Sequence, residues 1–388
     1  MSAGTRRVVA VVMLCHFIAA FAALGMPPFF ALILQRSLHN DVPWLAGAFY
    51  VVPTLLAAIS APWWGQLADR FGKKPLLMRA QLGLAASFLL ASYATSSSAF
   101  LAALVLQGVL GGTFSASNAY LATVASGTTL TRSLTAMQWS ARAALVAAPA
   151  CLGLWMGAGS PIMLYRWLAL LPLAAAALIA WLPAGDATGA AQRPAARSTG
   201  TAAPATPRQI YVLQFAFVLA TVATFPYFIP DLQHRMPALS TAAAGLLFGL
   251  PHLVYLAAAP LLSRRLGLAP SLTLLATAYG TLAVALLAQA APLELPALVA
   301  WRLLMGIAMT VGFIALHALV ASVVHAGNAG RTFGWFESSS KWGGVAAGLG
   351  AGAAVSLAGQ RAPYLLGAAL LVPAAAYLLT ARQRMSPL

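Results

Sequence analysis

Charged residues are scarce in this chain, and acidic ones are the scarcest. Only 7% of the 388 residues are charged, with 6 Asp and Glu against 22 Lys and Arg. Soluble domains carry about 25% charged residues, so a water-soluble fold is excluded for a chain that is 61% hydrophobic. The two cysteines, Cys15 and Cys151, fall in apolar runs, which gives no indication of a disulfide framework.

Long apolar runs make up most of the chain. Each is close to the ~20 residues that a helix needs to cross ~30 Å of hydrocarbon, whereas spanning strands would alternate apolar and polar residues. We therefore predict an all-α integral membrane protein with twelve transmembrane helices. The runs lie near residues 8–35, 43–64, 75–95, 98–125, 137–157, 163–182, 210–230, 241–262, 270–290, 296–322, 333–356 and 363–380.

The net charge of +16 is distributed unevenly about these spans. If the N-terminus is cytoplasmic, most of the 22 basic residues, Arg79 among them, fall on the cytoplasmic side, as the positive-inside rule requires. Asp41, Asp231 and Glu294 fall on the opposite side. This bias needs no nucleic-acid partner. It predicts a multi-pass protein of a bacterial-type inner (plasma) membrane, with both termini in the cytoplasm.

The second half of the chain repeats the first at an offset of 198 residues. The repeated positions include Pro28 and Pro226, Gly47 and Gly245, Pro53 and Pro251, and Gly108 and Gly306. Between the halves, the segment rich in Ala, Pro, Thr, Gly and Arg has no hydrophobic period. We predict an N-terminal six-helix bundle over 1–183, a flexible cytoplasmic linker over 184–208 and a C-terminal six-helix bundle over 209–388. Such duplicated halves are typical of secondary transporters.

The connection between the second and third spans carries the most specific motif. It reads Gly-Gln-Leu-Ala-Asp-Arg-Phe-Gly-Lys-Lys-Pro over residues 65–75. By itself it indicates a tight turn with glycines and topology-setting charges. It also matches the signature loop of the major facilitator superfamily, which the chain resembles over nearly its whole length. The resemblance implies the major facilitator fold, two pseudo-symmetric six-helix bundles, and a cytoplasmic gating loop built from Gly65, Asp69, Arg70, Gly72, Lys73 and Lys74.

Ionisable residues inside membrane spans are costly, which makes them functional candidates. Gln138 and Arg142 in the fifth span align with Glu337 and Lys341 in the eleventh, and a spacing of four places each pair on one helix face. Glu337 can load and release a proton, with Lys341 setting its charge state. The alternative is a static ion pair between them. The family fold implies that both spans border the central cavity.

Arg142 and Lys341 bring two cations to a site with one acid, which favours an anionic or polyhydroxylated substrate. The alternative is that Arg142 pairs with Glu337. Trp139 and Trp342 flank these residues and either line the substrate site or pack against neighbouring helices. Lipophilic cations are disfavoured as substrates, because they need an acidic cavity.

Arg302 and three histidines also fall inside the spans. Arg302 lies four residues before Gly306, a pattern that the family shows more often in the fourth span, where this chain has Leu104. Arg302 either replaces that arginine or reaches the outer membrane interface. His16, His252 and His317 are either proton relays or structural hydrogen-bonding contacts. The histidines lack metal-ligand spacing, so we predict neither a metal nor a cofactor.

The sequence contains no nucleotide-binding loop and no nucleophile constellation, so we do not expect an enzyme or a primary pump. We predict a monomeric secondary active transporter for protons and a small-molecule substrate. Our first expectation is proton-coupled efflux of a small polar or anionic metabolite such as a siderophore, because residues 138–142 and 338–342 are similar to those of exporters of hydrophilic siderophores. The alternatives are multidrug or sugar efflux, import of an organic anion, and a role as a membrane scaffold or sensor.

Overall fold

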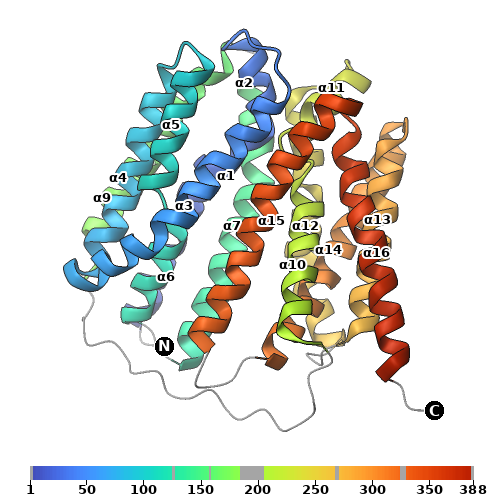
Figure 1. The fold of residues 1–388 in the computed structure, drawn as a ribbon. Helices are drawn as coiled ribbons and strands as arrows, with labels where there is room; N and C mark the ends of the chain where they lie inside the picture. The colour runs from blue at the N-terminus through green and yellow to red at the C-terminus, as the bar shows by residue number, and fades with distance from the viewer. Residues whose placement is uncertain are drawn as a thin grey trace. The chain divides into compact units, whose positions relative to one another are not determined.

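A computed structural model describes residues 3–124, 127–156, 159–183, 205–266, 271–323 and 329–385, apart from some side chains within these ranges. Helices make up nearly all of this backbone, and these residues contain no strand (Figure 1). The predicted all-α fold is confirmed. Most of the predicted linker, 184–208, lies outside the described residues.

The chain divides into two compact units. The first contains residues Leu239–Leu246 and the helices α1 (Ala3–Gly25), η1 (Pro27–Phe29), α2 (Phe30–Arg36), α3 (Trp44–Phe71), α4 (Lys73–Ser92), α5 (Ser97–Leu110), α6 (Thr113–Val124), α7 (Gly127–Trp155), η2 (Pro161–Met163), α8 (Leu164–Leu168) and α9 (Leu170–Ala180). The second contains α10 (Pro207–Val222), α11 (Phe228–Arg235), α12 (Thr241–Leu266) from Leu247 onward, α13 (Leu272–Ala290), α14 (Leu295–Val323), α15 (Ala329–Ala358) and α16 (Ala362–Met385).

Within the described residues, 9 helical segments are long and apolar enough to cross a membrane. The predicted fifth, seventh and eleventh spans are not among them. They are nevertheless helical, in α7, in α10 with α11, and in α15. These helices carry many of the polar side chains of the candidate site, and polar residues reduce the hydropathy of a span. The total of twelve spans stays a prediction from the sequence.

The predicted fourth span is broken in its middle. α5 ends at Leu110, and α6 begins after Gly112, whose φ is +87°. The carbonyls that a helix end leaves unbonded are satisfied by neighbouring helices. Arg79 Nη1 donates to Leu110 O and Trp64 Nε1 to Val109 O, each at 2.6 Å. Arg79, expected to be a cytoplasmic charge, therefore stabilises the break, with its guanidinium 3.5 Å from the centre of the Trp64 ring.

The sequence repeat corresponds to the same close backbone contact in each unit. A Cβ atom added to Gly108 would lie 2.9 Å from Pro53 Cα, and one added to Gly306 would lie 2.9 Å from Pro251 Cα. Both distances are shorter than Cβ atoms tolerate. In each unit, a proline-containing turn of one helix thus lies directly against a glycine of another, and this contact requires glycine.

We expect Gly306→Ala to destabilise the folded protein by about 1–3 kcal/mol, because the new methyl group would overlap with the backbone at Pro251. Gly280→Ala is the matched control, since a Cβ atom there would meet nothing within 4 Å. Thermal unfolding of the detergent-solubilised variants, followed by size-exclusion chromatography, measures the difference. Equal melting temperatures for the two variants would contradict the contact.

Candidate functional site

In each unit, a serine hydroxyl holds a later helix against the first helix of that unit. Ser140 Oγ of α7 donates to Met13 O of α1 at 3.1 Å. Ser339 Oγ of α15 donates to Tyr211 O of α10 at 2.7 Å. The donors are 199 residues apart in sequence and the acceptors 198. The repeat is therefore preserved down to a single interhelical hydrogen bond, of a kind that associates helices in membranes.

These two bonds determine which face of each helix carries the candidate cations. An α-helix turns by about 100° per residue, so residues two positions from a serine lie on nearly the opposite face. Gln138 and Arg142 are each two positions from Ser140, and Lys341 is two positions from Ser339. Gln138 is exposed, and both cations are half-buried. Each cation therefore lies on the helix face turned away from the first helix of its own unit.

Two tryptophans accompany the cations. Trp139 is 36% exposed and Trp342 is 53% exposed, so neither belongs to the core of its unit. Glu337 belongs to α15, one turn before Lys341, but its side chain lies outside the described residues. Its pairing with Lys341 stays a prediction.

The second unit adds uncharged polar groups that the sequence analysis missed. Gln214 Nε2 donates to Ser340 Oγ at 2.6 Å and to Phe336 O at 3.1 Å. The hydroxyls of Tyr211 and Ser338 lie 3.3 Å apart. The signal was available: Tyr211 and Gln214 are spaced by three in an apolar span, which places both on one helix face. These groups line the junction of α10 and α15 with hydrogen-bonding atoms.

Two of the candidate histidines, His16 and His317, have different surroundings. His16 is 3% exposed, and its ring centre lies 5.1 Å from that of Phe114 on α6. Within the described part of the chain, neither ring nitrogen of His16 has a hydrogen-bond partner. His317 is exposed on α14, one turn after Phe313, whose ring centre is 6.1 Å away. Of these two, only His16 is enclosed by its unit.

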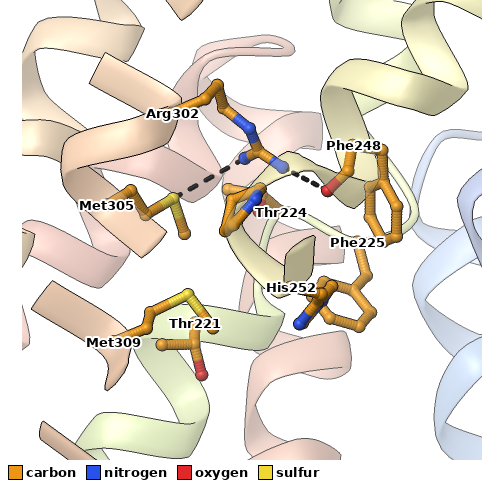
Figure 2. Close-up of a pocket in the computed structure, with 9 residues that line it drawn as sticks. Thr221, Thr224, Phe225, Phe248, His252, Arg302, Met305 and Met309 are labelled. Atoms are coloured by element: carbon orange, nitrogen blue, oxygen red, sulfur yellow. Dashed lines mark hydrogen bonds between the residues drawn. The ribbon is translucent and has the colours of Figure 1, made fainter. Parts of the chain in front are cut away.

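Arg302 is buried, at 3% exposure, and binds backbone carbonyls of α12 (Figure 2). Its Nε donates to Leu247 O at 2.9 Å and its Nη2 to Phe248 O at 2.6 Å. In a regular helix Leu247 O would accept from the N–H four residues later, but that residue is Pro251, which has none. Arg302 supplies the missing donor. Its guanidinium is thus held inside the unit and does not reach a membrane interface.

A small pocket lies beside Arg302. The buried His252 is within it, edge-on to the Phe225 ring at 6.0 Å between centres. Figure 2 shows the thioethers of Met305 and Met309 on the opposite wall. The lining residues are Thr221, Thr224, Phe225, Phe248, Pro251, His252, Arg302, Met305 and Met309. This lining is largely apolar, with Arg302 already bonded to the backbone.

The predicted gating loop is shorter than expected. α3 continues through Gly65 and Arg70 to Phe71, so the turn consists of Gly72 alone, with φ +96°. Lys73 begins α4 directly. Lys74 Nζ donates to Ala180 O at 2.9 Å, which satisfies a carbonyl at the end of α9. The side chain of Asp69 lies outside the described residues, so its role in a gate stays a prediction.

Asp231 is buried at 1% exposure, although the sequence indicated only an outer-side charge. Its carboxylate accepts from Arg235 Nη2 at 2.6 Å and from the Tyr364 hydroxyl at 3.2 Å. Arg235 also donates to the carbonyls of Gln289 and Ala291, both at 3.0 Å, at the end of α13. The spacing of four between Asp231 and Arg235 was the overlooked signal.

A duplicated, all-helical unit with apolar spans and buried cations defines the class of secondary membrane transporters. The profile of the Major Facilitator Superfamily matches residues 12–294. The chain therefore belongs to this superfamily and is a multi-pass membrane transporter, which confirms the family expected from the sequence.

Curated bacterial proteins are similar to part of this chain. The chain is 37% identical over 111 residues to the multidrug resistance protein MdtG of Yersinia enterocolitica, covering 28% of this chain and 27% of the relative. It is 36% identical over 113 residues to MdtG of Salmonella paratyphi A, covering 29% and 28%. The match thus spans only about a quarter of the length of these relatives.

Solved transporter structures share the fold over almost the whole chain. The nucleoside transporter NupG superimposes with a TM-score of 0.76 at 15% identity, covering 96% of this chain and 99% of that one. The human organic anion transporter MFSD10 superimposes with a TM-score of 0.70 at 20% identity, covering 97% and 100%. At these identities the likeness establishes the fold alone.

We expect Arg302→Met to destabilise the protein by about 1–3 kcal/mol, because it leaves the buried carbonyl of Leu247 without a donor. Pro251→Ala restores an N–H for Leu247 O, so the same substitution should cost less in that background. Thermal unfolding of the four proteins of this double-mutant cycle measures the coupling. Strictly additive effects would show that Arg302 does not compensate for Pro251.

Proposed function

We propose that this protein is a proton-driven efflux transporter that exports anionic or strongly polar organic molecules. Outward transport is supported by the partial similarity to bacterial proteins named for multidrug resistance. The preference for anions comes from the residues of this chain. A siderophore with carboxylate or hydroxyl groups falls within this class, as do anionic drugs.

The observation that carries this proposal is the repeat-related pair of cations. Arg142 and Lys341 lie on the faces of α7 and α15 opposite the serines that attach these helices to their units. Residues 70–183 contain no Asp or Glu at all, so that part of the first unit offers no acid to attract a lipophilic cation. A guanidinium can bind a carboxylate through two parallel hydrogen bonds. Tyr211 and Gln214 supply further groups for substrate hydroxyls.

Proton coupling is proposed for Glu337. It lies one turn from Lys341 on α15, close enough in sequence for the cation to influence its charge state. A carboxylate that gains a proton on one side of the membrane and loses it on the other would link substrate export to the proton gradient. Asp231 is a less suitable carrier, because Arg235 and Tyr364 already bind its carboxylate.

We expect Arg142→Ala to weaken transport of a carboxylate substrate about tenfold or more, since hydrogen bonds to charged groups contribute roughly 1.5–3 kcal/mol. Transport of the methyl ester of the same compound should fall by less than about twofold, because the ester offers Arg142 no charged group to bind. Uptake into inverted proteoliposomes with an imposed pH gradient measures both. Arg142→Lys is the control that keeps the charge but not the fork geometry. Equal losses for acid and ester would mean that Arg142 is structural.

Glu337→Gln should abolish transport driven by the pH gradient while leaving substrate exchange without a gradient, because the amide cannot carry a proton. Both rates are measurable in the same proteoliposome preparation. Gradient-driven transport at the wild-type rate would remove Glu337 from the coupling mechanism.

Chelator output from iron-starved cells lacking the gene distinguishes a siderophore from other anions. A siderophore exporter predicts less chelator in the medium and more in the cytoplasm, with recovery when the intact gene is returned. Unchanged output combined with export of anionic drugs would assign the protein to multidrug efflux.

A further inference from the structure

His16 occupies the position that Gln214 has in the second unit, 198 residues later. There, Gln214 donates to Ser340 Oγ. The residue at the position of Ser340 in the first unit, 199 residues earlier, is Ala141, which has no hydroxyl. His16 therefore lacks the partner that its counterpart has. Its ring instead lies against Phe114 of α6, with both nitrogens unpaired within the described residues.

Other buried polar atoms without a partner lie on helices around His16. In the described part of the chain they include Gln81 Oε1, Ser117 Oγ and Asn118 Oδ1. Gln81 and Ser117 are fully buried. Gln81 Nε2 donates to the carbonyl of Cys15 at 3.4 Å, which places Gln81 beside the residue preceding His16. Buried polar atoms in proteins nearly always have a partner, so this group of orphans requires an explanation.

Helix register brings three of these groups to one level of the unit. Val12, Leu77 and Leu121 belong to one hydrophobic cluster at the junction of α1, α4 and α6. The contacts of Gln81 with Cys15 and of His16 with Phe114 show that α1 and α4 run in the same direction and α6 in the opposite one. Cys15 and Ile18 of α1 and Phe114 and Ala116 of α6 belong to the same cluster, so His16 and Ser117 lie within its span. Gln81 of α4 joins them through its hydrogen bond to Cys15 O.

We propose that His16 is a proton-binding site of the first unit, and that the oxygens of Gln81, Ser117 and Asn118 hold its imidazolium through intervening water. The link between proton binding and transport rests on the proposed function, whereas proton binding by itself does not. A neutral imidazole has one N–H donor, whereas the imidazolium has two. Two amide oxygens that can only accept, together with a hydroxyl that can accept, suit the imidazolium better. Proton uptake from water forms one N–H bond and breaks one O–H bond, and release reverses the step.

Of the charged and titratable groups around this site, histidine has the ordinary pKa closest to neutral. α9 contains no charged or titratable residue, and α4, α6 and α7 contain no Asp or Glu. The Tyr120 hydroxyl of α6 donates to Pro183 O, and Arg79 of α4 donates to Leu110 O. Lys74 donates to the end of α9, and Cys15 Sγ donates to Ala175 O. On α7, Arg142 lies on the helix face turned away from α1.

Nitrogen-15 NMR of histidine-labelled protein in nanodiscs tests proton binding without any substrate. We expect one imidazole signal that disappears in His16→Gln and changes protonation between about pH 4 and pH 9, a range that brackets the ordinary histidine value. Ser117→Ala should lower the proton affinity of this signal about threefold or more, with His39→Gln as the control for signal assignment. A His16 signal that stays neutral throughout the range would overturn the proposal.

The double variant His16→Gln/Ala141→Ser tests the link to transport. It copies the Gln214–Ser340 pair of the second unit, which adds a hydrogen bond between α1 and α7 while removing the titratable ring. Gradient-driven transport should fall about tenfold while exchange persists. Driven transport at the wild-type rate would overturn the coupling role of His16. If the wild-type protein shows no gradient-driven transport although His16 titrates, the proposed function fails and the proton-binding site stands.

Discussion

Inside a lipid bilayer, every backbone carbonyl released by a broken or kinked helix must find a donor within the protein. Several cations of this chain serve that constraint. Arg79 binds the carbonyl at the end of α5, Arg302 binds those released around Pro251, and Lys74 binds the end of α9. Arg142 and Lys341 stand out because their helices are attached to their units by serines on the opposite faces.

The same constraint explains where the two units agree and where they differ. The Ser140 and Ser339 hydroxyls form matching bonds, and the contacts of Gly108 and Gly306 with proline turns match as well. The polar pair of the second unit, Gln214 and Ser340, has no equivalent in the first, where the corresponding residues are His16 and Ala141. A scaffold kept by both halves, with polar groups that differ between them, allows the halves to have different roles in one transport cycle.

Several features of the site were accessible to sequence reasoning and others were not. The alignment of Gln138 and Arg142 with Glu337 and Lys341 followed from the offset of the repeat alone. The break at Gly112 was missed because paired glycines in an apolar run hardly change its hydropathy. The predicted gating turn proved to be one residue long, since glycine at position 65 was compatible with the helix that runs through it. Asp231 was taken for a surface charge because the sequence does not show which acids fold inward.

By itself, the sequence determined the membrane class, the superfamily and the duplicated organisation. Hydrophobic runs reflect the free-energy cost of placing each residue in hydrocarbon, and that cost depends on the residue itself. Only the tertiary structure decided what each polar group does, because the value of a buried donor depends on the acceptor beside it. Arg302 and Arg142 are equally improbable inside a span, yet one is bonded to the backbone that Pro251 leaves unsatisfied, while the other lies on the helix face turned away from the first helix of its unit. That distinction arises from packing between segments more than 50 residues apart.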